Sequence, residues 1–152
     1  MKVGLSLGSN LGDRLRHLQQ AKNFLISLST DRWHLASPAY ETGPVDCPPN
    51  SPAFFNAVVE IEFAGTPQTL LKKIQTYQAA HGRDRSLPKN AARAIDIDIL
   101  YFGELKIAEP DLVVPHPRML ERRFVLVPLA IIRPDLVLPN GVGDVNFVQA
   151  DW

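Results

Sequence analysis

The sequence predicts an α+β fold, a ferredoxin-like antiparallel sheet with helices packed against it. One observation is that apolar residues alternate with polar ones in some segments and recur at helical spacing in others. The other is the order of these segments, strand, helix, strand, strand, helix, strand, which is the split βαβ pattern. The chain has 152 residues, enough to bury a core without disulfides, so we expect residues 1–152 to form a single domain.

The first strand and the first helix are separated by a segment rich in turn-forming residues. A strand over 3–7 ends in the sequence Gly-Ser-Asn-Leu-Gly at 8–12, which we interpret as a scaffold turn. This turn lacks the lysine and the spacing of a Walker phosphate-binding loop. A helix is predicted over 13–28, because leucines recur on one face and charged residues on the other.

Two further strands are predicted over 33–40 and 54–63. In the second of them apolar and polar residues alternate, which is typical of a strand with one buried face. The strands are joined by residues 41–52, which are rich in proline, and a long stretch without regular structure inside a compact domain is usually functional or disordered. Cys47 in this loop is the only cysteine, which excludes an internal disulfide, and we interpret it as an ordinary loop thiol.

Two helices, with two strands between them, are predicted beyond residue 65. Thr66 and Pro67 have the N-cap and first-turn preferences of a helix, which should end near Gly82. The remaining elements are a strand over 95–100, a short returning strand near 105–107, and a helix over 124–132 that stops before Arg133 and Pro134. We assign no role to the segment from 141 to 152.

The composition favours a small-molecule ligand over nucleic acid. The 16 Lys and Arg residues balance the 16 Asp and Glu residues, so the chain has no net positive charge to attract a nucleic acid. The opening apolar run is too short for a signal peptide, and no run is long enough to cross a bilayer. We therefore expect a cytoplasmic monomer that binds small molecules and has no nucleic-acid or membrane partner.

Two aspartates, Asp96 and Asp98, interrupt the apolar strand over 95–100. Side chains along a strand alternate between its faces, so both carboxylates should point the same way, with α-carbons about 6.5 Å apart. Crowded carboxylates favour a cation between them, and Mg²⁺ held by few carboxylates completes its shell with water and substrate phosphates. The alternative is a solvated strand face, where exposed acidic residues are common.

A cationic loop precedes this strand. Gly82-Arg83-Asp84-Arg85 is followed by Lys89 and Arg93, so several cationic side chains approach the aspartates. Arginine and lysine bind phosphate oxygens through charge-assisted hydrogen bonds. Together, the loop and the paired carboxylates point to phosphate chemistry.

These features belong to a longer series of motifs. They are Leu7-Gly8-Ser9-Asn10-Leu11-Gly12-Asp13, Tyr40-Glu41-Thr42 with Pro44, Phe54-Phe55-Asn56-Ala57, Gly82-Arg83-Asp84-Arg85, Arg93 with Asp96-Ile97-Asp98-Ile99-Leu100, and Pro115-His116-Pro117-Arg118 with Arg122 and Phe124-Val125-Leu126. In this order and spacing, the chain closely resembles the 6-hydroxymethyl-7,8-dihydropterin pyrophosphokinase family from about residue 3 to residue 140.

The resemblance implies an enzyme of folate biosynthesis that transfers the terminal pyrophosphoryl group of ATP to the hydroxymethyl group of the pterin and releases AMP. It also implies that Asp96 and Asp98 hold two Mg²⁺ ions. Metals that bridge the phosphates would neutralise their charge and favour in-line attack. Arg83 and Arg93 would be catalytic, by stabilising charge on the transferred group and on the leaving AMP.

The family positions also give two sets of binding residues. The expected pterin-binding residues are Thr42, Pro44, Val45, Phe54, Asn56 and Phe124, with the two phenylalanines stacking on the ring and Asn56 reading its edge. The expected ATP-binding residues are Gln75, Arg83, Arg85, Arg93, Ile99, His116 and Arg122. Without the resemblance, Phe54 and Phe124 would be interpreted as core residues and Asn56 as a polar residue on the strand surface.

Some positions depart from the family pattern and leave alternatives open. Gln78 stands where glutamate is usual, Phe54 where tyrosine is frequent, and Asn90-Ala91-Ala92 where the family has tryptophan, glycine and proline. One alternative is a paralogue that binds pterin or nucleotide but has lost or redirected the transfer. Another is an RNA-binding ferredoxin-like domain that stacks bases on its sheet, against which the neutral charge and the paired aspartates count.

Overall fold

The computed structural model describes residues 1–43, 53–81, 94–136, 138–139, 141 and 145–152. Its main sheet has the strand order β5-β1-β4-β3-β8, with β2 also pairing with β4, and every pair is antiparallel. The strands are β1 (Lys2–Ser9), β2 (His34–Ala36), β3 (Ala39–Thr42), β4 (Phe54–Glu62), β5 (Asp96–Phe102) and β8 (Val145–Gln149). A separate hairpin contains β6 (Ile107–Glu109) and β7 (Leu112–Val114).

The α-helices are α1 (Arg14–Leu28), α2 (Pro67–Ala80) and α3 (Arg123–Ile132), and single 3₁₀ turns occur at Thr30–Arg32 and Met119–Glu121. The predicted α+β class, an antiparallel sheet with helices packed against it, is confirmed. Helix α1 follows β1 and leads to β2 and β3, which pair with β4. Helix α2 follows β4 and leads to β5, which pairs with β1. The helix starts follow from capping: Asp13 accepts a hydrogen bond from the Arg16 N–H, and Thr66 accepts one from the Thr69 N–H.

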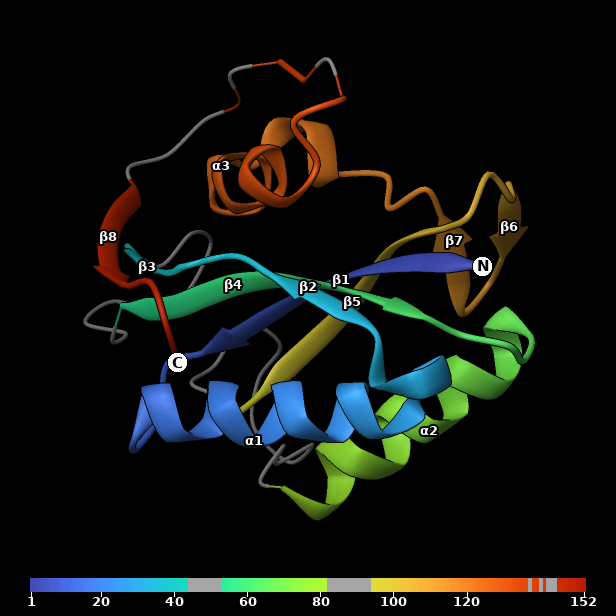
Figure 1. Ribbon diagram of the computed structural model, residues 1–152, viewed down its shortest axis with the longest axis horizontal. Coiled ribbons are helices and arrows are strands. Elements are labelled where there is room, and N and C mark those ends of the chain that lie inside the picture. The colour runs from blue at the N-terminus through green and yellow to red at the C-terminus, as the bar shows by residue number, and fades with distance from the viewer. Residues whose placement is uncertain (44–52, 82–93, 137, 140, 142–144) are drawn as a thin grey trace.

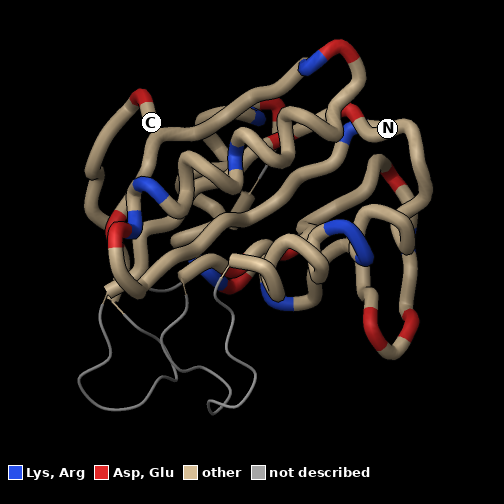
Figure 2. The backbone as a smooth tube through the Cα atoms, turned by 90° about the horizontal axis from the view of Figure 1, so that it is seen from below, with Lys and Arg blue, Asp and Glu red and all other residues tan. Residues whose placement is uncertain are grey.

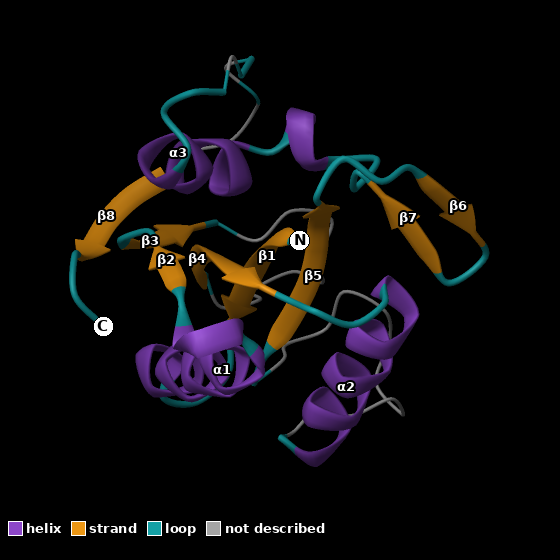
Figure 3. Cartoon of the chain, turned by 45° about the vertical axis from the view of Figure 1, so that its right-hand side comes forward, coloured by secondary structure: helices purple, strands orange, loops and turns teal. Residues whose placement is uncertain are grey.

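The helices cover both faces of the sheet. Helices α1 and α2 lie on one face and α3 on the other (Figures 1 and 3). The main core lies under α1 and α2, whereas a smaller cluster under α3 contains Val58, Leu100, Met119, Val125 and Leu129. Because α3 covers its second face, β4 buries polar side chains too: Asn56 is 3% and Glu60 2% exposed.

The structure corrects several details of the sequence interpretation. The strand predicted over 33–40 is interrupted, because the Ser37 hydroxyl accepts a hydrogen bond from the Val58 N–H and Pro38 has no N–H to donate. Gly8 belongs to β1 rather than to a turn. The expected short strand near 105–107 lies instead at Ile107–Glu109 and pairs with β7. The segment to which no role was assigned supplies β8.

A polar network fastens the end of α3 to the sheet. Buried Glu60 accepts hydrogen bonds from the Tyr101 hydroxyl and, at 3.0 Å, from Arg133 just after α3. Burial, together with the bond to Glu60, raises the pKa of Tyr101. The Tyr101 ring lies across Gly4 of β1, where a β-carbon would stand far inside contact distance of the ring. Gly4 therefore leaves the space that the network needs.

We expect Gly4→Ala to destabilise the fold by about 1–3 kcal/mol, because overpacking would displace the Tyr101 ring from Glu60. Urea denaturation measures the change in the free energy of unfolding. Gly43→Ala is the matched control, since nothing lies within 4 Å of a β-carbon at Gly43. Equal unfolding midpoints for the two variants would show that the Tyr101 ring moves aside without a loss of stability.

Candidate functional site

The paired aspartates lie on the face of the sheet that α3 covers. Ile97 and Ile99 of the same strand are buried in the core under α1 and α2, so alternation along β5 puts Asp96 and Asp98 on the opposite face. Both aspartates are partly exposed, whereas Leu100 packs into the cluster under α3. The two carboxylates therefore share one partly exposed surface at the start of β5.

The strand register puts Asp96 in a row with residues of the neighbouring strands. Gly8 of β1 pairs with Asp96 on one side and with Asn56 of β4 on the other. Residues paired across strands point to the same face, so Asp96 and Asn56 are two strand spacings apart, about 10 Å. Gly8 has no side chain to separate them. The Asp96 carboxylate and the buried Asn56 amide thus lie along one row on the same face of the sheet.

The amide of Asn56 is oriented by Thr42 on the adjoining strand. Its Nδ2 donates to the Thr42 hydroxyl oxygen at 2.7 Å, and both side chains are buried. The amide oxygen lies over Gly8, 3.1 Å from where a β-carbon would be. With its nitrogen engaged by Thr42, Asn56 presents its oxygen as an acceptor towards the row.

The two candidate stacking rings come from the sheet and from the helix above it. Phe54 lies over Gly8, with its Cδ1 3.4 Å from the position of a β-carbon there. Phe124 belongs to the first turn of α3 and packs against the cluster under that helix, and the Arg122 guanidinium lies 5.5 Å from its ring centre. Both rings are partly exposed, so neither is wholly a core residue.

His116 adds a hydrogen-bond donor near Asp96. The main-chain N–H of His116 donates to the Leu100 carbonyl at 2.7 Å. Its ring Nδ1 accepts from the main-chain N–H of Arg118 at 3.2 Å. Burial lowers the pKa of His116, and the positive charges of Arg122 and Arg118 lower it further, although Asp96 opposes them. Both effects favour the neutral ring, and because Nδ1 accepts from the Arg118 N–H, its proton lies on Nε2, where it can donate to an anion.

Gln75 and Ile99 belong to the opposite face of the sheet, the face that α1 and α2 cover (Figure 3). Gln75 is exposed on α2, whereas the Ile99 side chain is 6% exposed and belongs to the main core. A nucleotide contact at Ile99 would therefore have to use its main chain. Gln78, which departs from the family pattern, is buried, and its side-chain oxygen accepts a 2.6 Å hydrogen bond from the Ile97 N–H. It fastens α2 to β5, a role that the sequence did not indicate.

Several predicted site residues lie outside the described residues. They are Pro44, Val45, Arg83, Arg85 and Arg93, together with Cys47, Lys89 and Asn90. Among the described residues no three His, Cys, Asp or Glu side chains gather as a metal site. Asp96 and Asp98 offer hard carboxylate oxygens, the donor type that Mg²⁺ prefers.

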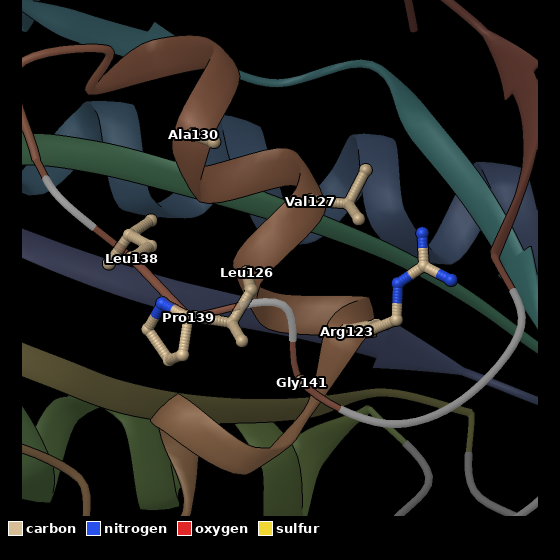
Figure 4. A pocket seen from close by; sticks show the side chains of 7 residues that line it. All are labelled: Arg123, Leu126, Val127, Ala130, Leu138, Pro139 and Gly141. Atoms are coloured by element: carbon tan, nitrogen blue, oxygen red, sulfur yellow. The ribbon is translucent and has the colours of Figure 1, made fainter.

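A pocket of about 520 Å³ lies elsewhere, beside α3. Figure 4 shows it between α3 and the segment with Leu138, Pro139 and Gly141. Its lining is mostly apolar, and none of the predicted site residues contributes to it. Acidic and basic residues are interspersed along the described chain in Figure 2. In the described part of the chain no helix is long and apolar enough to cross a membrane.

Comparison with known proteins identifies a family. Residues 4–134 match the model described as 7,8-dihydro-6-hydroxymethylpterin-pyrophosphokinase (HPPK). The 2-amino-4-hydroxy-6-hydroxymethyldihydropteridine pyrophosphokinase of Pseudomonas aeruginosa is 39% identical over 140 residues, which cover 92% of this chain and 85% of that protein. The protein of the same name from Bacillus subtilis is 41% identical over 128 residues, 84% of this chain and 75% of that protein.

Some relatives are much longer than this chain. The folic acid synthesis protein fol1 of Pneumocystis carinii is 39% identical over 137 residues, which are 90% of this chain but 18% of that protein. The similarity therefore concerns one part of that longer protein.

Proposed function

The chain belongs to the 7,8-dihydro-6-hydroxymethylpterin-pyrophosphokinase family, and from this premise we propose that the row from Asp96 across Gly8 to Asn56 is the floor of its active site. The protein is a pyrophosphokinase of folate biosynthesis, which transfers pyrophosphate from ATP to the hydroxymethyl group of 6-hydroxymethyl-7,8-dihydropterin. The row is the observation that supports this placement, because it joins a phosphate-binding end and a ring-binding end through Gly8, over which the Phe54 ring lies.

The pterin end contains Asn56, Thr42, Phe54 and Phe124. A pterin is flat and carries several N–H donors on its edge. The Asn56 oxygen accepts from this edge, since Thr42 holds the amide nitrogen. Phe54 from the sheet and Phe124 from α3 stack on the two faces of the ring. Pro44 and Val45, outside the described residues, remain sequence predictions for the same pocket.

The phosphate end contains Asp96, Asp98, His116 and Arg122. When bound, Mg²⁺ ions would neutralise phosphate charge and polarise the phosphorus under attack. Asp96 and Asp98 would hold these ions through their carboxylate oxygens. The His116 Nε2–H and the Arg122 guanidinium donate to phosphate oxygens. Several points remain predictions from the sequence. They are the number of Mg²⁺ ions, the monomeric state, the cytoplasmic location, and the roles of Arg83, Arg85, Arg93, Gln75 and Ile99.

The products of the reaction test this function. Purified protein with ATP, Mg²⁺ and 6-hydroxymethyl-7,8-dihydropterin should form AMP and pterin diphosphate in equal amounts. ADP with a monophosphorylated pterin would contradict attack at the β-phosphorus. If calorimetry detects binding of both substrates but no AMP forms, the paralogue without transfer activity is the correct alternative.

Phe124→Ala is expected to weaken pterin binding by about 1–3 kcal/mol, because it removes an aromatic stacking contact and part of its packing. ATP affinity should change less. Isothermal titration calorimetry with each ligand separately measures both affinities. Ile131→Ala, at a half-exposed position on the same helix, is the control and should leave both unchanged. An unaltered pterin affinity in a folded Phe124→Ala protein would exclude the stacking.

A further inference from the structure

The 145–152 segment lies beyond the part of the chain that matches the family model, which ends at residue 134. Its strand β8 pairs with β3, in the register Tyr40 with Phe147, Glu41 with Asn146 and Thr42 with Val145. Figure 1 shows β8 beside β3 at the edge of the sheet, from where the chain turns towards α1. The segment thus runs along the full length of β3.

Trp152 anchors this segment at the start of β3. The Trp152 side chain is 9% exposed and belongs to the main core, and its indole N–H donates to the Ser37 carbonyl at 2.7 Å. The Lys22 ammonium of α1 lies 4.3 Å from the indole ring centre. Ser37 is itself held by β4, because its N–H donates to the Val58 carbonyl and its hydroxyl accepts from the Val58 N–H, both at 2.9 Å.

Strand β3 supports the pterin end of the site. Its Thr42 holds the Asn56 amide, and its Tyr40 is the register partner of Asn56. Yet β3 pairs with β4 only from Tyr40 to Thr42. Strand β8 covers its other edge, and Phe147 packs its ring against Tyr40 with centroids 6.2 Å apart. Without β8, β3 would be a short edge strand among the described strands, held by little pairing.

We propose that the 145–152 segment is a strap that positions the pterin-binding strand. Trp152 is its anchor, and β8 holds Thr42 in the place from which it orients Asn56. Trp152 is a positioning residue, since it touches neither the carboxylates nor the row. This inference rests on the proposed function, because it takes Thr42 and Asn56 as pterin-binding residues. It predicts that the strap affects pterin binding more than ATP binding.

Variants of Trp152 separate the effect on pterin binding from the effect on ATP binding. Trp152→Ala should raise the dissociation constant for 6-hydroxymethyl-7,8-dihydropterin about tenfold, a coupling of ordinary size between distant groups. The dissociation constant for a nonhydrolysable ATP analogue with Mg²⁺ should stay within about twofold, a change of less than half a kcal/mol. Trp152→Phe keeps a ring but loses the bond to Ser37, and should give a smaller increase for the pterin. Asn146→Ala, at an exposed position of β8, is the control.

Hydrogen exchange gives a readout that does not depend on ligand or activity. The amides of β3 should exchange faster in Trp152→Phe than in the wild type, while those of β5 keep their protection. Unchanged β3 protection, or equal weakening of both ligands in a folded variant, would overturn the strap. If the wild type binds no pterin, the proposed function fails, and β3 exchange alone then decides whether the segment holds the strand.

Discussion

Replacing Asp96 or Asp98 with alanine is expected to lower kcat by about a thousandfold or more, because each change removes a proposed ligand of Mg²⁺. The carboxylates lie on one partly exposed face at the start of β5. Two carboxylates on one face favour a cation that neutralises their charge, so the loss should appear in the Mg²⁺ dependence of turnover.

Three measurements make this result decisive. Steady-state AMP formation gives kcat, titration with Mg²⁺ gives the metal dependence, and urea denaturation gives the free energy of unfolding. Asp111→Ala is the control, since this exposed acid lies in the turn between β6 and β7. If Asp98→Ala and Asp111→Ala both turn over at nearly the wild-type rate, the aspartates belong to a solvated strand face.

Local features of the site could be predicted from the sequence because they depend on neighbouring residues. The period of two along a strand is enough to put Asp96 and Asp98 on one face. Thr66 and Pro67 define a helix start by capping and by a preset φ, and α2 begins there. The motif at 115–118 indicated His116, although its tautomer depends on the N–H of Arg118 and was found only in the structure.

Features that depend on distant pairing could not be predicted in this way. The row joins Asp96 to Asn56 through Gly8, and the pairing of three strands distant in sequence sets this register. Asn56 and Glu60 are buried because α3 returns over their face, which the alternation within β4 does not reveal. The segment 145–149 is short and polar in part, and it becomes a strand because β3 offers it a free edge.

The network at the end of α3 has the same long-range origin. Glu60, Tyr101 and Arg133 are brought together by β4, β5 and the residue after α3. Arg133 also makes a bidentate pair with Asp135, at 2.9 and 2.7 Å. Glu60 is 2% exposed, so its charge depends on Arg133 for compensation. This contact joins the residue that follows α3 to β4.

Arg133→Met should destabilise the fold by about 3–5 kcal/mol, because it leaves the Glu60 carboxylate buried without a partner of opposite charge. Glu60→Gln in the same protein should recover much of this loss, since glutamine keeps an acceptor for the Tyr101 hydroxyl and has no charge to compensate. A double-mutant cycle by urea denaturation gives the coupling energy. Asp135→Ala is the control for the exposed half of the pair and should leave the unfolding midpoint nearly unchanged. If the variant with both Arg133→Met and Glu60→Gln is as unstable as Arg133→Met alone, the loss comes from the packing of the arginine stem. It would then not come from the uncompensated charge of Glu60.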